Sequence, residues 1–312
     1  MGNETKISWC DRTFSGWIGC QKASLGCDNC YAQRDFTRKP RWTNTWGPPE
    51  TTERKRTSDS NWKKPGGWNN QGMWKECVLC GWRGEDKKLK NIIIAPTCPN
   101  CAGSSFIPAR QRVFAYSLGD VFEQARQVTE WRKDFLHMAE TTQNLDWLVL
   151  TKRIEHVTEC VPNEWLNYWP KNIWIGTTVE DHSTVWRLDH LAELPAPVRF
   201  VSFEPLVGNI PYREFSKAFN WAIVGGESGP KARPMKEEWA IEIKQYCLDN
   251  DIPFHFKQWG EFEPILSDLT NKINYIRSGR KNIDPMLDGQ YWHEFPDTNS
   301  QLTGRTEKLI IA

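Results

Sequence analysis

Seven of the ten cysteines fall into two groups with spacing that is typical of metal ligands. One group consists of two CxxC pairs, Cys77 with Cys80 and Cys98 with Cys101, with seventeen residues between them. Each pair can supply two thiolates to one tetrahedral Zn²⁺. The surrounding segment 74–108 is too short for its own hydrophobic core, so a bound metal would stabilise it. The spacing predicts a small zinc ribbon, with an iron site as the alternative.

The other group has three thiols, Cys20, Cys27 and Cys30. Three cysteines can hold a [4Fe–4S] cluster and leave the fourth iron open to a ligand. S-adenosylmethionine (SAM) binds such an iron through its amino and carboxylate groups, and an electron delivered to its sulfonium releases a 5′-deoxyadenosyl radical that abstracts hydrogen. A zinc site completed by a distant histidine is the alternative. The remaining thiols, Cys10, Cys160 and Cys247, have no partner at ligand spacing and are predicted to be structural.

The composition describes a folded protein without a strong charge bias. The 312 residues include 40 Lys and Arg against 39 Asp and Glu, so no global basic field indicates a nucleic-acid-binding protein. No apolar run approaches the ~20 residues of a membrane span, and the first six residues lack a signal-peptide core. We therefore expect a cytoplasmic protein without membrane partners, in which thiols stay reduced and the cysteines serve another purpose than disulfides.

The elements that would position these cysteines follow from residue 113 onward. Short apolar runs alternate with amphipathic segments, which is typical of strands buried on both faces in repeated βα units. The predicted strands are 113–116, 147–150, 173–175, 198–201, 221–224 and 254–256, and the predicted helical segments are 121–143, 153–168, 181–194 and 235–250. An α/β fold with a full or partial (β/α) barrel accounts for this order.

All six predicted strands are followed by small, charged or hydrogen-bonding residues. They include Ser117, Gly119, Asp120, Lys152, Arg153, Thr177, Glu180, Glu204, Glu227 and Lys257. In a β/α barrel the carboxyl ends of the strands meet at one edge, here called the mouth, where active sites are built. Helix capping by Asp120 or Asp181 would explain one or two of these endings but not six. We expect the loop that carries the three cysteines to close over the mouth.

Two further segments carry weaker signals. Gly225-Gly226-Glu227 lacks the spacing of a phosphate-binding loop, so its glycines more plausibly allow a close backbone approach. Residues 31–64 contain nine Lys and Arg against four acids, with tryptophans interleaved through residue 68. Cations and flat rings suit phosphates and unstacked bases, so nucleic-acid contact and a solvated loop packed on the barrel are both open.

Taken together, the motifs resemble a phage-encoded family labelled by gene products thirty-seven and sixty-eight, which looks like a branch of the radical-SAM superfamily. The resemblance covers nearly the whole chain, and its matching pieces are Trp9, 19–20, 26–32, 58–62, 117–120, 150–153, 202–206, 224–230, 232–234, 256–261, 287–289 and 294–296. It implies a radical-SAM-like full or partial barrel, a [4Fe–4S] cluster on Cys20, Cys27 and Cys30, and SAM bound in the mouth.

The resemblance also implies roles for the residues of the mouth. A turn after the second strand of the superfamily holds the methionine amine, and Ser117, Gly119 and Asp120 occupy that position here. The implied cofactor-binding set is completed by Thr177 and Glu204. The residues implied to bind substrate or to manage protons are Lys152, Glu204, Glu227 and Lys257.

For substrate, the resemblance implies a base in phage DNA, such as an amino-acid-modified thymine that is rearranged after hydrogen abstraction in the infected bacterial cytoplasm. A reductase or flavodoxin-type protein would donate the electron. The basic segment and a zinc ribbon beside the mouth would contact the DNA or a modified nucleotide. The alternatives are a DNA-lesion lyase with the same cofactors, a non-catalytic zinc-stapled nucleic-acid-binding protein, and a peptide-modifying enzyme.

The expected organisation along the chain has five parts. A first strand and cluster loop occupy 1–32, a Trp-rich basic insert 33–73, and the zinc ribbon 74–108. The remainder of the barrel spans 109–262, and a C-terminal strap spans 263–312.

Overall fold

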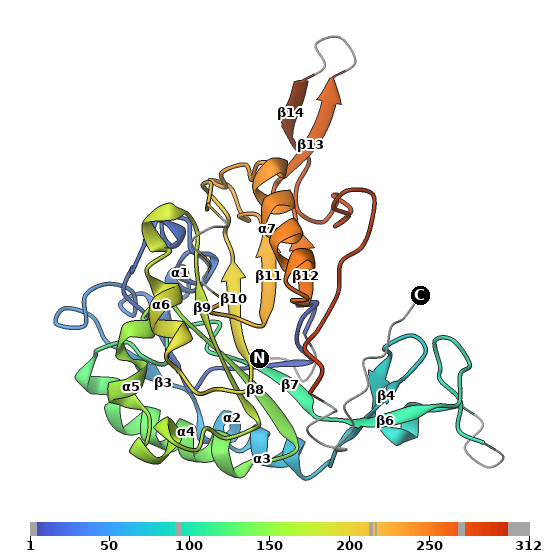
Figure 1. The fold of residues 1–312 in the computed structure, drawn as a ribbon. Coiled ribbons are helices and arrows are strands. Elements are labelled where there is room, and N and C mark those ends of the chain that lie inside the picture. The colour runs from blue at the N-terminus through green and yellow to red at the C-terminus, as the bar shows by residue number, and fades with distance from the viewer. Residues whose placement is uncertain (1–4, 91–94, 212–214, 216, 268–271, 299–312) are drawn as a thin grey trace.

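A parallel sheet of seven strands forms the centre of the molecule. The computed structural model describes residues 5–90, 95–211, 215, 217–267 and 272–298. The strands lie in the order β1 (Arg12–Phe14), β7 (Gln111–Ala115), β8 (Leu145–Thr151), β9 (Ile173–Thr178), β10 (Arg199–Phe203), β11 (Trp221–Gly225) and β12 (Phe254–Gln258). All six strands predicted from the apolar runs are confirmed. The sheet curls into a half-barrel with β1 and β12 at its edges (Figure 1), so the expected barrel is present in its partial form.

The predicted helical segments differ in how far they form regular helices. The first and last contain 13-residue helices, α4 (Thr129–Thr141) and α7 (Glu237–Asp249). The second contains only α5 (Val157–Cys160) between 3₁₀ turns, and the third contains α6 (Arg187–Ala192). The helix α5 ends because Val161 precedes Pro162, and the residue before a proline disfavours helical backbone; Val161 is extended.

Both faces of the sheet are buried, which is why its strands read as continuous apolar runs. The outer face packs against α4, α6 and α7 in a large core. The inner face forms a second core with aromatic side chains from neighbouring strands, and Trp9 packs into it from the N-terminal segment, with its ring centroid 4.5 Å from that of Phe114. Several of the 18 tryptophans, including Trp174 and Trp221, therefore fill the interior of the half-barrel.

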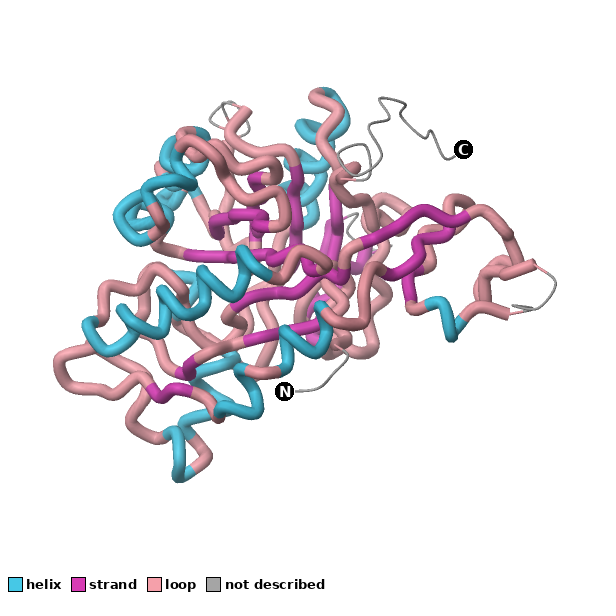
Figure 2. The backbone as a smooth tube through the Cα atoms, turned by 90° about the horizontal axis from the view of Figure 1, so that it is seen from below, coloured by secondary structure: helices cyan, strands magenta, loops and turns pink. Residues whose placement is uncertain are grey.

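The ribbon, residues 74–109, is described except at 91–94, and it contains a three-stranded antiparallel sheet of β4 (Trp74–Cys77), β5 (Arg83–Gly84) and β6 (Phe106–Ala109). Strand β6 leads through Arg110 directly into the amino end of β7, and the ribbon projects from that side of the sheet (Figure 2). Arg83 of the ribbon pairs with Asp11, which precedes β1, at 3.5 Å. The expectation that the ribbon lies beside the mouth is wrong, because the ribbon joins the sheet at the amino ends of the strands and the mouth is at their carboxyl ends.

The basic insert is not a plain loop. It contains α1 (Tyr31–Thr37), β3 (Lys55–Arg56), which pairs with β2 (Trp17–Ile18), and the short helices α2 (Asp59–Trp62) and α3 (Lys64–Asn69). Trp68 is buried in the outer core, and Arg54 is buried in an ion pair with Glu123 at 2.7 Å. Part of this insert therefore packs on the barrel. This agrees with the alternative in which the insert is a solvated loop whose tryptophans pack on the barrel.

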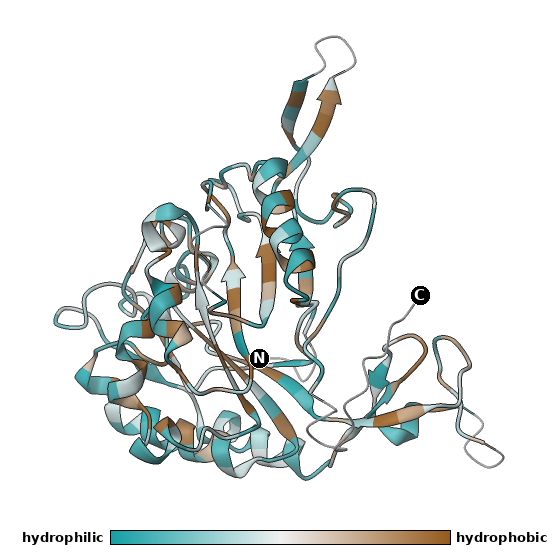
Figure 3. Ribbon diagram, in the orientation of Figure 1, coloured by the Kyte–Doolittle hydropathy of each residue, from teal (hydrophilic) through white to brown (hydrophobic). Residues whose placement is uncertain are grey.

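After the barrel the chain forms a β-hairpin of β13 (Phe262–Ser267) and β14 (Lys272–Arg277), which the sequence did not predict. The hairpin projects from the body and carries exposed apolar side chains, among them Leu266 and Ile276 (Figure 3). The following segment packs back on the barrel through Leu287 and Phe295. The last part of the expected strap, 299–312, lies outside the described residues. Within the described residues, no helix is long and apolar enough to cross a membrane.

Candidate functional site

The three-cysteine loop, residues 20–30, lies across the carboxyl ends of the parallel strands, as expected. The Ser24 hydroxyl donates to Glu180, which follows β9, at 2.6 Å. The Asn29 amide donates to Glu227, which follows β11, at 3.1 Å. Residues distant in sequence thus hold the loop over the mouth from several strands.

The first cysteine of the loop lies beside a cation. The Arg153 guanidinium, which follows β8, is 3.6 Å from the Cys20 sulfur and donates to the Gln21 carbonyl at 2.7 Å. Burial raises the pKa of the Cys20 thiol, and Arg153 acts in the opposite direction by favouring the thiolate. The site is therefore built so that a negative charge on Cys20 has a counter-charge in contact.

Cys27 lies close enough to both Cys20 and Cys30 to interact with each of them electrostatically. Cys30 precedes α1, and its thiol accepts backbone hydrogen bonds from Ala32 and Gln33, while burial raises its pKa. The charge of Cys27 raises the pKa of both Cys20 and Cys30. The described residues contain one group of potential metal ligands gathered within 4.8 Å of one another, the four ribbon cysteines, and the three cysteines of the loop are not part of it.

Glu180 is a central residue of the mouth that the expected site set did not include. Its carboxylate is fully buried and accepts from Lys152 at 2.5 Å, Arg187 at 2.9 Å and Ser24. Burial raises the pKa of Glu180, but the two cations outweigh it and hold the pKa below its usual value. The predicted catalytic residue Lys152 is thus in an ion pair that anchors the loop. A lone glutamate after a strand gives no sequence signal for such a network.

Asp120 does not stand free to bind the amine of a cofactor. Its carboxylate accepts from the Thr151 hydroxyl at 2.6 Å, the Lys152 amide at 3.1 Å and Arg153 at 3.0 Å. Burial raises its pKa, yet Arg153 and these hydrogen bonds hold the pKa below the usual value. Asp120 therefore orients Arg153 toward Cys20.

The neighbours of Asp120 contribute backbone rather than side chains. The Ser117 carbonyl accepts from the Tyr31 hydroxyl of α1 at 2.9 Å. A Cβ on Gly119 would lie 3.2 Å from the Gly19 carbonyl and 3.3 Å from the Trp17 indole nitrogen. Gly119 thus allows the turn after β7 to pack closely on the segment that leads to Cys20.

Thr177 does not face the interior of the half-barrel. Successive strand residues point to opposite faces, and Thr177 shares the outer face with Ile173 and Ile175. Its buried hydroxyl donates to the Thr151 carbonyl at 3.0 Å. Its neighbour Thr178 has the inward register, and the period of two along β9 was the signal that could have found it.

Glu227, predicted as catalytic, instead helps to hold the loop in place, through Asn29 and through Arg233. The Arg233 guanidinium donates to both carboxylate oxygens of Glu227, at 2.7 and 2.9 Å, and also to the Leu25 carbonyl at 3.0 Å. A Cβ on the preceding Gly226 would overlap the carbonyl oxygen of Trp259. The glycines of this turn therefore allow a close backbone approach, as predicted.

Glu204 and Lys257 are the predicted residues that the structure leaves most available. Glu204 follows β10, Lys257 is the penultimate residue of β12, and the two form an ion pair at 2.8 Å with side-chain exposures of 12% and 24%. The Ser202 hydroxyl donates to Glu204 at 3.4 Å, and a Cβ on Gly225 would lie 2.5 Å from the Glu204 carboxylate. This pair can bind a ligand of either charge in the mouth.

A polar cavity of about 290 Å³ adjoins the loop on the side of Cys20. Its lining includes Lys22, Lys152, Arg153 and Arg187, against the carboxylates of two glutamates. The excess of cations suits an anionic group of a small ligand placed beside the first residues of the three-cysteine loop.

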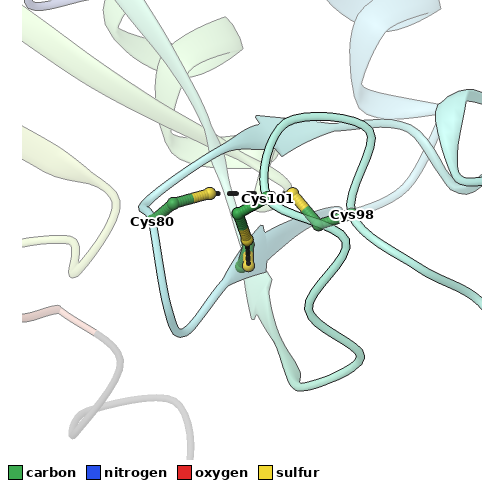
Figure 4. Close-up of side chains that lie close together, drawn as sticks. Cys80, Cys98 and Cys101 are labelled. Atoms are coloured by element: carbon green, nitrogen blue, oxygen red, sulfur yellow. Dashed lines mark hydrogen bonds between the residues drawn. The ribbon is translucent and has the colours of Figure 1, made fainter.

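The four ribbon cysteines converge, as their spacing predicts. The sulfur of Cys77 lies 3.6 Å from that of Cys101, the sulfur of Cys80 lies 3.6 Å from that of Cys98, and all four fall within 4.8 Å of one another (Figure 4). Thiolates about 2.3 Å from a tetrahedral Zn²⁺ would be about 3.8 Å apart. The arrangement fits one metal ion.

Comparison with known proteins gives a family without an assigned activity. The family model described as a protein of unknown function, DUF5131, matches residues 4–296. No curated protein and no solved structure matches the chain.

Proposed function

The chain belongs to this family, DUF5131, and we propose that it is a radical SAM enzyme that abstracts hydrogen from a base of phage DNA. The observation that carries the proposal is the three-cysteine loop held over the carboxyl ends of a curled parallel sheet. Cys20, Cys27 and Cys30 would hold the [4Fe–4S] cluster, with SAM in the mouth. The ribbon cysteines would hold a structural Zn²⁺ near the amino ends of the same strands.

The residues around the loop fit a cluster in charge. Three thiolates bring negative charge into a partly buried site, and Arg153 lies in contact with one of them while Lys152 favours the thiolate of Cys30. When bound, the cluster supplies the electron and SAM supplies the hydrogen-abstracting group.

The chain's own residues would bind and orient the reactants. Glu204 can accept hydrogen bonds from an amine or from ribose hydroxyls, and Lys257 can pair with a carboxylate or phosphate. Lys152 and Glu227, engaged in ion pairs, would position the loop rather than touch the substrate. The assignment of DNA as substrate is supported by the family resemblance and by the basic, Trp-rich insert, and a reductase or flavodoxin-type protein would supply the electron.

Metal analysis after anaerobic purification tests the proposal. We expect about four irons and one zinc per chain, an EPR signal of the reduced protein that changes with SAM, and formation of 5′-deoxyadenosine. The variant C27S should lose iron and keep zinc, while C80S should lose zinc and keep iron. A colourless protein that carries only zinc after reconstitution would contradict the proposal and leave the non-catalytic, zinc-stapled alternative.

The substrate requires a separate assay. DNA or a modified nucleoside should stimulate or alter SAM cleavage, and a SAM-cleaving enzyme indifferent to both would contradict the assignment. Products from irradiated DNA would distinguish a lesion lyase from an enzyme that rearranges a modified thymine.

A further inference from the structure

A second cavity, of about 330 Å³, lies in the basic insert between α1 and α2. Three cations line it, Lys39, Arg41 and Lys64, together with the rings of Phe36 and Trp42. The rest of the lining consists of hydroxyl or amide side chains and an apolar floor, and as far as the structure describes it, the lining contains no carboxylate. The near-neutral chain thus concentrates positive charge and aromatic surface in one hollow.

We propose that this cavity binds one nucleotide of single-stranded DNA, with its phosphate on the cations and its base against Trp42 or Phe36. The inference rests on the proposed function and deepens it, because it names where the nucleic-acid substrate is held. Phosphate binding by Lys and Arg beside aromatic platforms is how proteins hold single strands without reading sequence. The volume is in the range of small-ligand pockets, which suits a single nucleotide.

The geometry of the rings places the two kinds of contact side by side. The Lys39 ammonium lies 4.4 Å from the ring centroid of Phe36, and the Arg41 guanidinium lies 4.8 Å from that of Trp42. The two rings meet nearly edge to face, with centroids 6.2 Å apart and planes at 65°. Each ring thus has a cation over it in the free protein, so a base that stacks there would displace that cation toward the phosphate of the same nucleotide.

The cavity adjoins the three-cysteine loop through a shared core. Phe36 and Trp42 pack against a small cluster of Ile18, Ala32 and Leu118, and Cys30 packs against the same cluster. Leu118 follows Ser117, whose carbonyl accepts the Tyr31 hydroxyl at the edge of the mouth. A strand held in the cavity would thus bring a neighbouring nucleotide toward the loop that carries the proposed cluster.

The test is the binding of fluorescein-labelled oligo(dT) to the full-length protein, followed by anisotropy across a range of salt concentrations. The double variant K39Q/R41Q should weaken binding at least about tenfold and reduce the salt slope by about 1.4, since each cation on a single strand contributes about 0.7. The matched control R38Q/K63Q removes two exposed cations of the same insert that do not line the cavity, and it should bind more like the wild type.

A stacking variant tests the aromatic contact. W42L should weaken binding about five- to a hundredfold and leave the salt slope unchanged, because stacking is not an ionic contact. The surface charge variants remain informative if W42L fails to fold, which circular dichroism would reveal. Equal effects of K39Q/R41Q and R38Q/K63Q would overturn the proposal, as would the absence of oligo(dT) binding. Tighter binding of oligo(U) would overturn the assignment to DNA.

The outcome is separable from that of the proposed function. Oligonucleotide binding is measured without SAM, whereas the proposed function is judged by iron content, EPR and 5′-deoxyadenosine. If the protein cleaves SAM and the K39Q/R41Q variant binds DNA as tightly as the control, only the proposal of a nucleotide site in the cavity would be overturned. A protein that lacks iron while its DNA binding depends on Lys39 and Arg41 would overturn only the radical chemistry.

Discussion

Individual side chains set the electrostatics of the three-cysteine loop. Burial alone would keep the Cys20 thiol protonated, because a buried thiolate loses its hydration. Contact with Arg153 offsets only part of this cost, since the Cys20 pKa stays well above its usual value, and Asp120 holds Arg153 in place at 3.0 Å. Residues that touch a metal ligand in this way tune its affinity for the metal without binding the metal themselves.

Replacing the cation beside Cys20 should therefore weaken iron binding. We expect R153M to lower the affinity for the cluster by about 10–100-fold, the usual effect of losing such a supporting contact. Iron retained per chain and the rate of iron loss to a chelator measure this. K22M is the matched control, since Lys22 belongs to the same loop but pairs with Asp28 at the surface. Equal iron loss in both variants would contradict a specific role for Arg153.

At the scale of elements, the turns after four parallel strands reach the loop. Ser117 follows β7, Arg153 follows β8, Glu180 follows β9 and Glu227 follows β11, and each contacts the loop or the start of α1. The loop has little regular structure of its own, so these contacts determine its position. The half-barrel thus acts as the frame that positions the cysteine-bearing loop.

The buried Glu180 predicts a dependence of stability on pH. Its pKa is lower in the folded than in the unfolded protein, so its stabilisation is present above pH ~4.5 and is lost as the pH falls through the folded pKa. E180Q leaves Lys152 and Arg187 without their partner and should cost about 3–5 kcal/mol at pH 7. In urea unfolding, the difference from the wild type should shrink below pH ~4.5. The exposed control E50Q should change little, and a pH-independent loss in E180Q would contradict the linkage.

The turn at Gly226 packs closely against the turn at Trp259, so replacing Gly226 and replacing Gly66 should change the stability of the protein in opposite directions. G226A places a methyl group against the Trp259 carbonyl and should destabilise the protein by about 1–3 kcal/mol or more. Gly66 in α3 has open space around its Cβ position, so G66A should instead stabilise by about 0.5–1 kcal/mol. Thermal unfolding of the two variants compares them, and a shift of the same sign in both would refute the packing argument.

At the scale of the whole molecule, the two cysteine groups lie at opposite ends of the strands of one sheet. The three-cysteine loop covers the carboxyl ends, while the ribbon joins the amino ends through Arg110 and the Arg83–Asp11 ion pair. The ribbon's own antiparallel sheet has few residues to bury, so its stability would depend on a metal held by its four cysteines. The ribbon site and the proposed cluster site should behave independently.

Removal of the ribbon metal should therefore leave the mouth intact. C80S, or mild chelation that extracts zinc, should make residues 74–109 sensitive to proteases, while iron content and SAM cleavage persist. Zinc analysis, limited proteolysis and 5′-deoxyadenosine formation would be measured on the same sample. Concerted loss of iron and zinc would show that the sites are coupled and contradict the separation.

Local sequence patterns were enough to predict a large part of the fold. Six strands followed from apolar runs because burial on both faces leaves no room for polar residues, and the ribbon followed from ligand spacing within short turns. The amino acid types at the mouth also followed, since parallel strands end at one edge. The hairpin of β13 and β14 was missed because its exposed strands have no buried face to impose a pattern.

Only the tertiary structure decided which polar residues of the mouth are engaged and which remain available. Glu180 meets Ser24 across 156 residues, Glu227 is clamped by Arg233, and Asp120 is saturated by its neighbours. Glu204 and Lys257 are left partly exposed. Such pairings depend on distances across the folded sheet, which no local pattern encodes, because a charged residue after a strand looks the same whether its partner is substrate or protein.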